Sequence, residues 1–175
     1  MNKIKLRALT HADLEKTLAW HNQEDISDLY SGHHFPVNVE MERIWYEKVL
    51  TSNFPVTVFG IELVESKELI GITVLRDINI INRVAEFGIY IGNTAERGKG
   101  LSKEATINTL LFGFLKLNLN RIFLKVLEEN TPAIKLYKAL GFTMEGKLRN
   151  SIFKNGEYKS EMIFSILKTE FKQNQ

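Results

Sequence analysis

A short segment that combines glycines with basic residues is the best candidate for binding an anion. It reads Glu96-Arg97-Gly98-Lys99-Gly100-Leu101-Ser102 and directly precedes a stretch with helical periodicity. A helix start presents unpaired backbone N–H groups and a positive dipole end, which suit a phosphate group. Gly98 and Gly100 let the backbone approach a bulky anion. The glycine spacing matches neither a Walker A loop nor a dinucleotide fingerprint. The segment therefore predicts either another kind of phosphate site or a glycine-rich turn from strand to helix.

A second segment places polar side chains at the end of a predicted strand. Asn130 precedes Thr131-Pro132, which is a strong helix start because Thr is a good cap and Pro suits the first turn. The amide of Asn130 can therefore reach out of the sheet. Tyr137 follows two turns later on a helix whose other face is apolar. A tyrosine in such a helix usually packs in the core or at its rim.

Composition limits the classes of protein that fit. The 175 residues contain 44% hydrophobic and 25% charged residues, which indicates one globular domain over 1–175. A formal net charge of +2 argues against a dedicated nucleic-acid binder. The absence of cysteine excludes disulfides and a cysteine nucleophile, and no metal site is predicted. No apolar run is long enough for a membrane span, and the charged N-terminus does not resemble a signal peptide. We therefore expect a cytoplasmic protein without membrane partners.

The elements that must position these segments fall into two halves. In the first half, alternating apolar and polar residues predict strands over 4–9, 56–64, 69–75 and 84–91. Helical spacing of apolar residues predicts a helix from Leu14 to either Ile26 or Leu29 and another over about 40–50. The second half predicts a helix over 101–117, a buried strand over 121–127 and a helix that ends at Gly141. Strands over 142–148 and 158–167 then pair through the Asn155-Gly156 turn. This order predicts an α+β fold whose mixed sheet is mostly antiparallel with a parallel pair in the middle.

Taken together, the two segments resemble the acyl-CoA site of the GNAT-superfamily N-acetyltransferases. Arg97-x-x-Gly100-x-Ser102 resembles their pyrophosphate loop, and Asn130, Ala133, Tyr137 and Gly141-Phe142 resemble their C-terminal segment. The resemblance covers most of the chain. The sequence is similar to two branches of this superfamily, one that acetylates ribosomal-protein N-termini and one that acetylates spermidine. Amino-sugar N-acetyltransferases share the same framework. Ser102 stands where Gly or Ala is commoner in the family, but Ser is also small.

The resemblance implies a set of residues that bind acetyl-CoA, the co-substrate. The strand over 87–91 would splay away from the parallel strand over 122–126, and the pantetheine arm would enter the gap. Backbone groups of Ile89, Tyr90 and Ile91 would bond the arm and polarise the thioester carbonyl. Backbone N–H groups of the loop would hold the pyrophosphate, and Asn130 would bond either the pantetheine or the helix start. The implied cofactor-binding residues are Ile89, Tyr90, Ile91, Arg97, Gly98, Lys99, Gly100, Leu101, Ser102, Asn130 and Ala133.

The resemblance also implies catalytic roles for two side chains. A neutral amine would attack the thioester directly, and Tyr137 matches the general acid that protonates the departing thiolate. Its phenol has a reference pKa near 10, so it is protonated at pH 7. Glu86 is the candidate base, since a partly buried carboxylate between apolar neighbours can relay a proton through water. The alternative for Glu86 is a structural carboxylate paired with Arg83 or Arg121.

The acceptor side of the site is marked less clearly. His33 and His34 are adjacent and point to opposite sides of an extended loop, so they make a poor metal site. They are either exposed loop residues or contacts to the acceptor. Asp25, Asp28, Glu40 and Glu42 make the same region acidic, which would suit a cationic amine but is also ordinary for a protein surface. The sequence does not decide the oligomeric state, although the resemblance implies relatives that commonly form dimers.

These observations predict an acetyl-CoA-dependent N-acetyltransferase acting on a primary amine. A small-molecule acceptor, either a polyamine or an amino sugar, is favoured because no basic ribosome-facing patch is evident. The alternatives are a protein N-terminal acetyltransferase of the ribosomal-protein type and a non-catalytic sensor that binds acetyl-CoA. Retention of both Tyr137 and Glu86 argues against the sensor, which would need neither.

Overall fold

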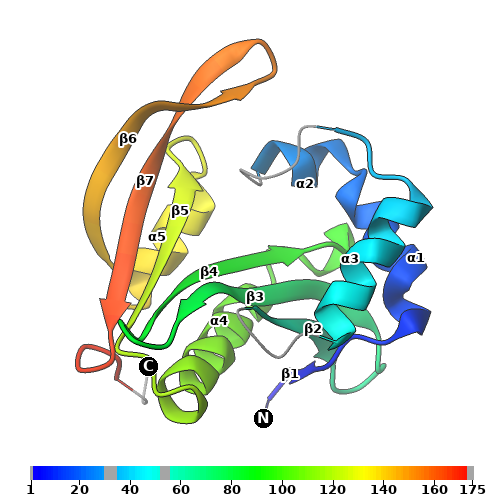
Figure 1. Ribbon diagram of the computed structural model, residues 1–175, viewed down its shortest axis with the longest axis horizontal. Coiled ribbons are helices and arrows are strands. Elements are labelled where there is room, and N and C mark those ends of the chain that lie inside the picture. Colours follow the sequence, from blue (N-terminus) through cyan, green and yellow to red (C-terminus); the bar gives the residue numbers. More distant parts are fainter. Residues whose placement is uncertain (1, 30–34, 52–55, 173–175) are drawn as a thin grey trace.

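The computed structural model describes residues 2–29, 35–51 and 56–172, and its centre is one mixed sheet (Figure 1). The strands lie in the order β1-β2-β3-β4-β5-β7-β6, and each neighbouring pair is antiparallel except β4 and β5. The predicted fold class is therefore confirmed. The strands are β1 (Ile4–Arg7), β2 (Thr57–Leu63), β3 (Leu69–Asn79), β4 (Val84–Ile91), β5 (Arg121–Leu127), β6 (Thr143–Lys154) and β7 (Glu157–Leu167).

Helices cover both faces of this sheet (Figure 1). The group α1–α3 packs on one face, while α4 and α5 pack on the other. The predicted helix over 101–117 ends as a π-helical turn, η3, rather than as regular α-helix. The helical elements are η1 (His11–Asp13), α1 (Leu14–His21), α2 (Glu24–Leu29), α3 (Val39–Thr51), η2 (Thr94–Glu96), α4 (Leu101–Leu111), η3 (Phe112–Lys116) and α5 (Thr131–Ala139). Among the described residues, no helix combines the length and the apolar character that a membrane crossing requires.

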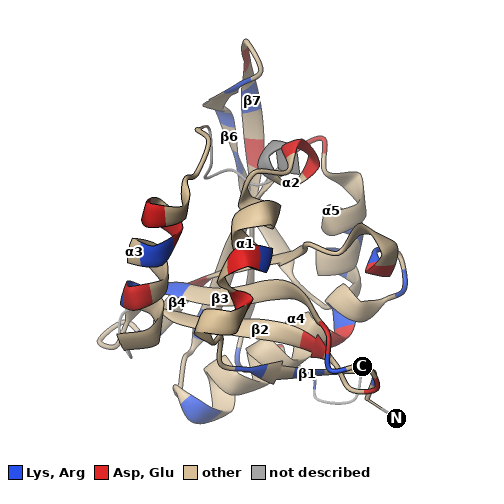
Figure 2. Cartoon of the chain, turned by 90° about the vertical axis from the view of Figure 1, so that its right-hand side faces the viewer, with Lys and Arg blue, Asp and Glu red and all other residues tan. Residues whose placement is uncertain are grey.

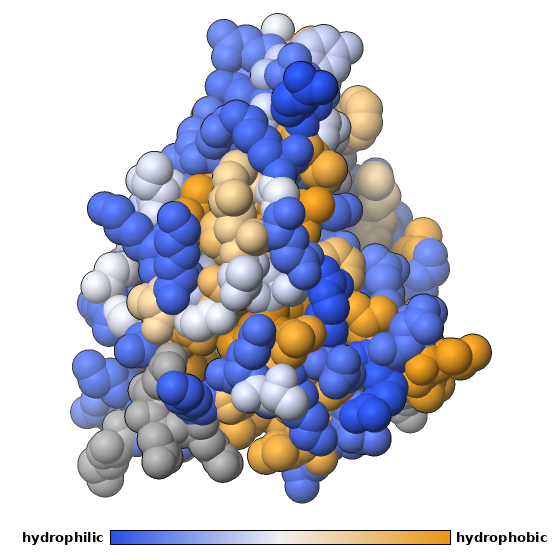
Figure 3. All heavy atoms as spheres, turned by 90° about the vertical axis from the view of Figure 1, so that its left-hand side faces the viewer, coloured by the Kyte–Doolittle hydropathy of each residue, from blue (hydrophilic) through white to orange (hydrophobic). Residues whose placement is uncertain are grey.

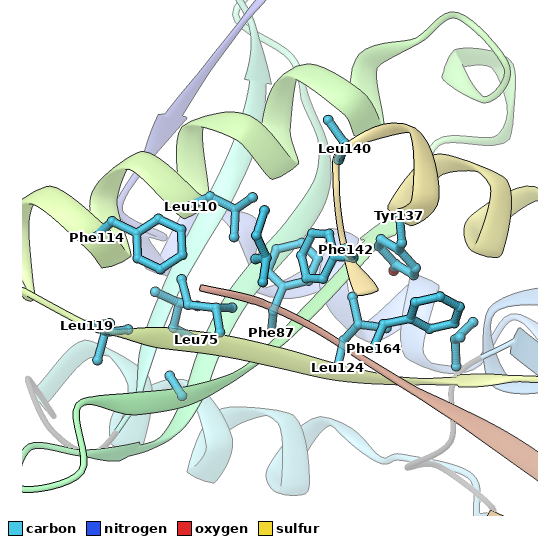
Figure 4. Packing of buried hydrophobic residues seen from close by; sticks show 14 of the residues in the cluster. Leu75, Phe87, Leu110, Phe114, Leu119, Leu124, Tyr137, Leu140, Phe142 and Phe164 are labelled. Atoms are coloured by element: carbon cyan, nitrogen blue, oxygen red, sulfur yellow. The ribbon is translucent and has the colours of Figure 1, made fainter. Parts of the chain in front are cut away.

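The largest core cluster lies between the sheet and the pair α4 and α5. Leu110 and Phe114 meet Leu75 and Phe87 from the sheet, and Tyr137 of α5 reaches the same cluster (Figure 4). These side chains are at least nine-tenths buried. Burying a side chain of this size stabilises the fold by about 2–3 kcal/mol. The core therefore fixes α5, and with it Tyr137, against the middle of the sheet.

The parallel pair β4 and β5 stays together over only a short distance. Val84, Ala85 and Glu86 pair with Arg121, Ile122 and Phe123, and the described pairing between the two strands ends there. Both strands continue, but β4 keeps its partner β3 and β5 keeps its partner β7. The two strands therefore diverge after Glu86, and the predicted splay over 87–91 is confirmed.

The last two strands form a long hairpin that extends beyond the rest of the sheet (Figure 1). Asn155 and Gly156 connect them with φ angles of 50° and 82°, which are the left-handed values that an Asn-Gly turn requires. β6 is largely exposed, and Figure 3 shows hydrophilic residues over much of the hairpin end of this face. The predicted hairpin is therefore confirmed, but β6 runs to Lys154 rather than stopping at Leu148.

A buried group of charges joins β1, η1 and β2. The guanidinium of Arg7 makes two hydrogen bonds of 2.8 Å to Asp13 and also pairs with Glu62. Burial alone would raise the pKa of Asp13, but bonds from Arg7 and Thr10 outweigh it and the pKa lies below its usual value. Bonds from Lys5 and Arg7 lower the pKa of Glu62 despite its burial. Both carboxylates are therefore stabilised in their charged form by the fold.

The pH dependence of stability follows from these directions. A carboxyl group whose pKa is lower in the folded state contributes stability above its unfolded pKa and loses it as pH falls through its folded pKa. We expect Asp13→Asn to lower the free energy of unfolding by about 2 kcal/mol at pH 7, because it removes charged hydrogen bonds to Arg7. In urea titrations the difference from the parent protein should shrink below pH 4. Glu40→Gln, at an exposed pair with Arg43, should change little. A difference for Asp13→Asn that stays constant from pH 7 to pH 3 would contradict the charge argument.

Candidate active site

The diverging strands border a cavity of about 470 Å³. Its walls come from β4, β5, the loop before α4 and the start of α5, with Ile26 of α2 and Arg76 of β3 at its sides. Among the described residues that line it, the charged side chains are four cations: Arg76, Arg97, Lys103 and Lys125. The cavity therefore lies between the two central strands and has cationic side chains among its lining residues, which suits a ligand with anionic groups.

The glycine-rich loop forms one end of the cavity. Gly98 and Gly100 have φ angles of 76° and 80°, and a Cβ atom added at either would meet no atom within 4 Å. The loop therefore needs glycine for its conformation and leaves open space beside its backbone. α4 begins directly after Gly100, so the N–H groups of Leu101 and Ser102 face no carbonyl of a preceding helical turn, whereas that of Lys103 donates to the carbonyl oxygen of Gly100 at 3.1 Å. Gly98, Gly100 and Ser102 line the cavity.

The charged side chains of this loop have partners within the chain. Arg97 donates from Nε to the carbonyl oxygen of Ile91 at 2.9 Å and pairs with Asp25 of α2. Lys99 pairs with Glu96 at 2.8 Å, and Leu101 is buried in the core. Arg97 therefore borders the cavity as predicted, whereas neither Lys99 nor Leu101 is among its lining residues. Their backbone groups can still belong to the anion-binding turn.

The other end of the opening is built by the start of α5. The Oδ1 atom of Asn130 accepts the backbone N–H of Ala133 at 3.2 Å, which caps the helix. Both residues line the cavity. Of the two roles expected for Asn130, the structure thus shows the bond to the helix start. A cap at this position holds the first turn of α5 against the end of β5.

Tyr137 lies where the cavity meets the core. Its side chain lines the cavity although the residue is only 7% exposed. The ring packs edge-on against Phe87 with 6.3 Å between centroids, and it also contacts Phe142 at 5.6 Å (Figure 4). Tyr137 therefore packs in the core, as one interpretation expected, and it also lines the cavity, where the general-acid role stays a prediction. The packing fixes the direction of the phenol.

Glu86 is buried at the point where β4 and β5 separate. It is 6% exposed, and its Oε1 atom lies 2.5 Å from the guanidinium of Arg76. The partners expected for a structural carboxylate were wrong: Arg83 donates to Asn118, and Arg121 pairs with Glu145. The reason is register, since Arg76 of β3 lies directly opposite Glu86 in the antiparallel ladder. Arg76 itself lines the cavity, so Glu86 borders the site through it.

Sequence reasoning missed one polar network beside the cavity. Nδ1 of His21 lies 2.7 Å from Oε2 of Glu42, and Nε2 lies 3.3 Å from the hydroxyl of Tyr90. The hydroxyl of Thr17 donates to the other oxygen of Glu42 at 2.6 Å. Glu42 is 1% exposed, so it is not the surface acidic residue that was expected. No sequence spacing signals this network, because its members come from α1, α3 and β4.

Of the other acidic residues expected near the acceptor, Asp25 and Glu40 have cationic partners, and the side chain of Asp28 lies outside what the structure describes. Asp25 pairs with Arg97, and Glu40 pairs with Arg43 on the exposed side of α3. Figure 2 shows acidic residues on both α2 and α3. His33 and His34 lie outside the described residues.

Comparison with known proteins agrees with this geometry. The family model described as an acetyltransferase (GNAT) domain matches residues 3–143. The chain is 33% identical to spermidine N(1)-acetyltransferase of Vibrio cholerae over 97% of this chain and 96% of that protein. The crystal structure of a spermidine N-acetyltransferase from Vibrio cholerae with CoA and spermine matches with a TM-score of 0.90 and 32% identity, and the match covers 96% of this chain and 97% of that one. A putative ribosomal N-acetyltransferase of Bacillus subtilis is 32% identical over 64% of this chain and 62% of that protein.

The match over nearly the whole length, together with the splayed strands, confirms the resemblance and the predicted co-substrate, acetyl-CoA. The chain belongs to the GNAT family of acetyltransferases and is an acetyl-CoA-dependent N-acetyltransferase.

Proposed function

We propose that this enzyme acetylates a primary amine of a polyamine, with Tyr137 as general acid. The observation that carries the acceptor is the similarity to spermidine acetyltransferases over almost the full length of both chains. The observation that supports the chemistry is the cavity, which Tyr137 and the anion-binding turn both line. A small diffusible acceptor also agrees with the sequence analysis.

The residues around the cavity fit acetyl-CoA, which supplies the activated acetyl group as a thioester. Arg97, Gly98, Gly100 and Ser102 would hold the pyrophosphate at the loop, and Lys103 adds charge there. The backbone of Ile89 to Ile91 borders the opening on the β4 side, where it would bond the extended arm. Asn130 and Ala133 would shape the opposite wall. A linear, anionic ligand thus meets cations at one end and strand edges along its length.

The proton requirements of the reaction fall on opposite sides of the transferred group. At pH 7, only about one in a thousand molecules of an aliphatic amine with a pKa near 10 is neutral. The amine must therefore lose a proton before it attacks. The departing thiolate must gain one, and the phenol of Tyr137 is protonated at that pH. Glu86 is the candidate base on the acceptor side, and its carboxylate is held by Arg76. Tyr137 would serve the leaving group, and either Glu86 or another group on the acceptor side would serve the attacking amine.

A second acceptor class is a protein N-terminus. The similarity to the putative ribosomal N-acetyltransferase favours it, but that match covers less of each chain. A peptide with a free N-terminus presents the same attacking group as a polyamine. Beyond that amine, a peptide continues as a chain of amides, whereas a polyamine continues as methylene groups with further cationic nitrogens. A direct comparison of substrates therefore separates the two classes.

A thiol-release assay with a panel of amines tests the proposed function. The panel holds spermidine, spermine, amino sugars and peptides with free N-termini, all with acetyl-CoA. We expect kcat/KM for the polyamines to exceed that for every other class by at least about tenfold, which corresponds to about 1.4 kcal/mol of transition-state binding. Faster turnover of peptides would contradict the polyamine proposal. Binding of acetyl-CoA without thiol release from any amine would instead support the sensor.

A further inference from the structure

The network of His21, Glu42 and Tyr90 has the arrangement of a proton relay that ends at the cavity. Tyr90 lines the cavity, and side chains along β4 alternate, so Tyr90 shares a face of the strand with Glu86. His21 lies behind Tyr90, and Glu42 lies behind His21. Three elements of the fold thus place a phenol, an imidazole and a carboxylate in sequence from the cavity inward.

The contact with Glu42 determines how the imidazole can act. A carboxylate 2.7 Å from Nδ1 keeps a proton on that nitrogen and directs the lone pair of Nε2 toward Tyr90. The same carboxylate stabilises the imidazolium when Nε2 takes a proton. The distance of 3.3 Å from Nε2 to the Tyr90 hydroxyl is long for such a bond, and bonds of this kind tighten when substrate is bound.

Packing shields His21 and Glu42 from bulk water. The side chain of His21 is 9% exposed and that of Glu42 is 1% exposed. The ring of Trp45 packs edge-on against His21 with 5.5 Å between centroids, and Trp20 packs edge-on against Tyr90 at 6.2 Å. Burying a carboxylate costs desolvation free energy, which its partners offset only in part. An apolar contact between α1 and α3 would avoid that cost.

We propose that Tyr90 and His21 relay the proton of the acceptor amine away from the cavity, with Glu42 positioning His21. The ammonium group of the substrate loses an N–H proton to the phenolic oxygen of Tyr90 while the Tyr90 proton passes to Nε2 of His21. The neutral amine then attacks the thioester carbonyl carbon and forms the N–C bond. As the C–S bond breaks, the thiolate takes its proton from Tyr137. The second proton of the attacking nitrogen passes to water, and the Tyr137 phenolate is reprotonated from water. The imidazolium later returns its proton to water. This inference rests on the proposed function and supplies a route for the amine proton that differs from Glu86.

Two observations favour this route over Glu86. The carboxylate of Glu86 is paired with the cation of Arg76, whereas Nε2 of His21 faces the hydroxyl of Tyr90, a residue that lines the cavity. In addition, the carboxylate of Glu42 compensates the positive charge that His21 gains when it accepts the proton. The titratable groups that face the imidazole include Glu42 from α3 and Tyr90 from β4, and Tyr46 stands next to Thr17 on the far side of Glu42.

The test is the pH profile of kcat/KM for the parent enzyme and for three variants. If His21 accepts the proton, kcat/KM of the parent falls at low pH as the imidazole becomes protonated in the free enzyme. Glu42→Gln keeps the shape and a hydrogen bond but removes the anion, which makes the imidazolium less stable. We expect its acidic limb to move to lower pH by about one unit. His21→Gln and Tyr90→Phe should each lower kcat/KM by about 100-fold at pH 7, and His21→Gln should abolish the limb.

Thr17→Val is the control for a purely structural network. It removes the bond to the other oxygen of Glu42 but no group of the relay. We expect it to lower thermal stability and leave the acidic limb in place. Glu86→Gln is measured alongside these variants as the test of the other candidate base. An acidic limb of kcat/KM that stays in place in Glu42→Gln, or that moves only in Glu86→Gln, would overturn the relay. The profile is recorded with whichever amine of the panel gives the highest turnover. Failure of polyamines as substrates thus contradicts the proposed acceptor, and the relay is still tested.

Discussion

Tyr137→Phe should lower kcat by about 10- to 1000-fold, the range expected for loss of one general acid. The dissociation constant for acetyl-CoA should stay unchanged, because the phenol acts on the leaving group rather than on the bound ground state. The substitution removes one oxygen and keeps the ring between Phe87 and Phe142, so the core should stay packed. The measurements are thiol release under saturating acetyl-CoA and calorimetric binding of CoA.

The matched control is Tyr158→Phe, which makes the same chemical change at an exposed position in the β6–β7 hairpin. It should retain full activity. The pH profile adds a second criterion: the basic limb of kcat, where the phenol of Tyr137 loses its proton, should disappear in Tyr137→Phe. Full activity of that variant would remove Tyr137 from the proton transfer and leave it a packing residue.

Gly100→Asp should abolish measurable binding of acetyl-CoA. A Cβ atom at this position points into open space, so the new carboxylate would occupy the place intended for the pyrophosphate. Like charges about 4 Å apart repel by about 4 kcal/mol in a partly solvated site, which corresponds to about a thousandfold weaker binding. The φ angle of 80° adds strain, but Asp tolerates left-handed backbone better than most residues. The measurement is CoA binding by calorimetry.

Two control variants separate charge from conformation. Gly100→Asn places an uncharged group of the same shape on the loop, and it should bind CoA more tightly than Gly100→Asp. Gly156→Asp introduces the same residue at a φ angle of 82°, also with open space around its Cβ, but in the hairpin turn. It should bind acetyl-CoA normally. Normal binding by Gly100→Asp would mean that the loop is not the pyrophosphate site.

Much of the fold could be predicted because it depends on local patterns. Alternating strands, the helix start at Thr131-Pro132 and the Asn155-Gly156 turn each follow from a backbone preference that neighbouring residues determine. The cap itself was predicted one residue too late, because Asn130 rather than Thr131 caps α5. The two binding segments could be found for the same reason, since each is a short, continuous stretch. The parallel pairing of β4 and β5 followed from the order of elements. The end of β6 was predicted too early because an exposed strand of a hairpin has weak apolar alternation.

The remainder depends on contacts between distant parts of the chain. The pairing of Glu86 with Arg76 follows from the register of β3 against β4, which a sequence pattern does not specify. Glu42 looked like an exposed acidic residue because it lies among charged residues on α3. Its burial becomes visible only when α1 brings Thr17 and His21 against it. Contacts between side chains on different elements therefore could not be predicted from the sequence, whereas motifs confined to one turn could.

The separation of β4 and β5 also places a sheet edge inside the protein. Unpaired strand edges are normally found at the border of a sheet, where they invite other chains to add a strand and aggregate. Here the open stretch of backbone lies between α2 and α5 rather than at the outside (Figure 1). This inner edge borders the cavity, since residues 87–91 of β4 and 125–127 of β5 line it. The fold thereby offers strand-like hydrogen bonding to an extended ligand in the interior of a sheet rather than at its outer border.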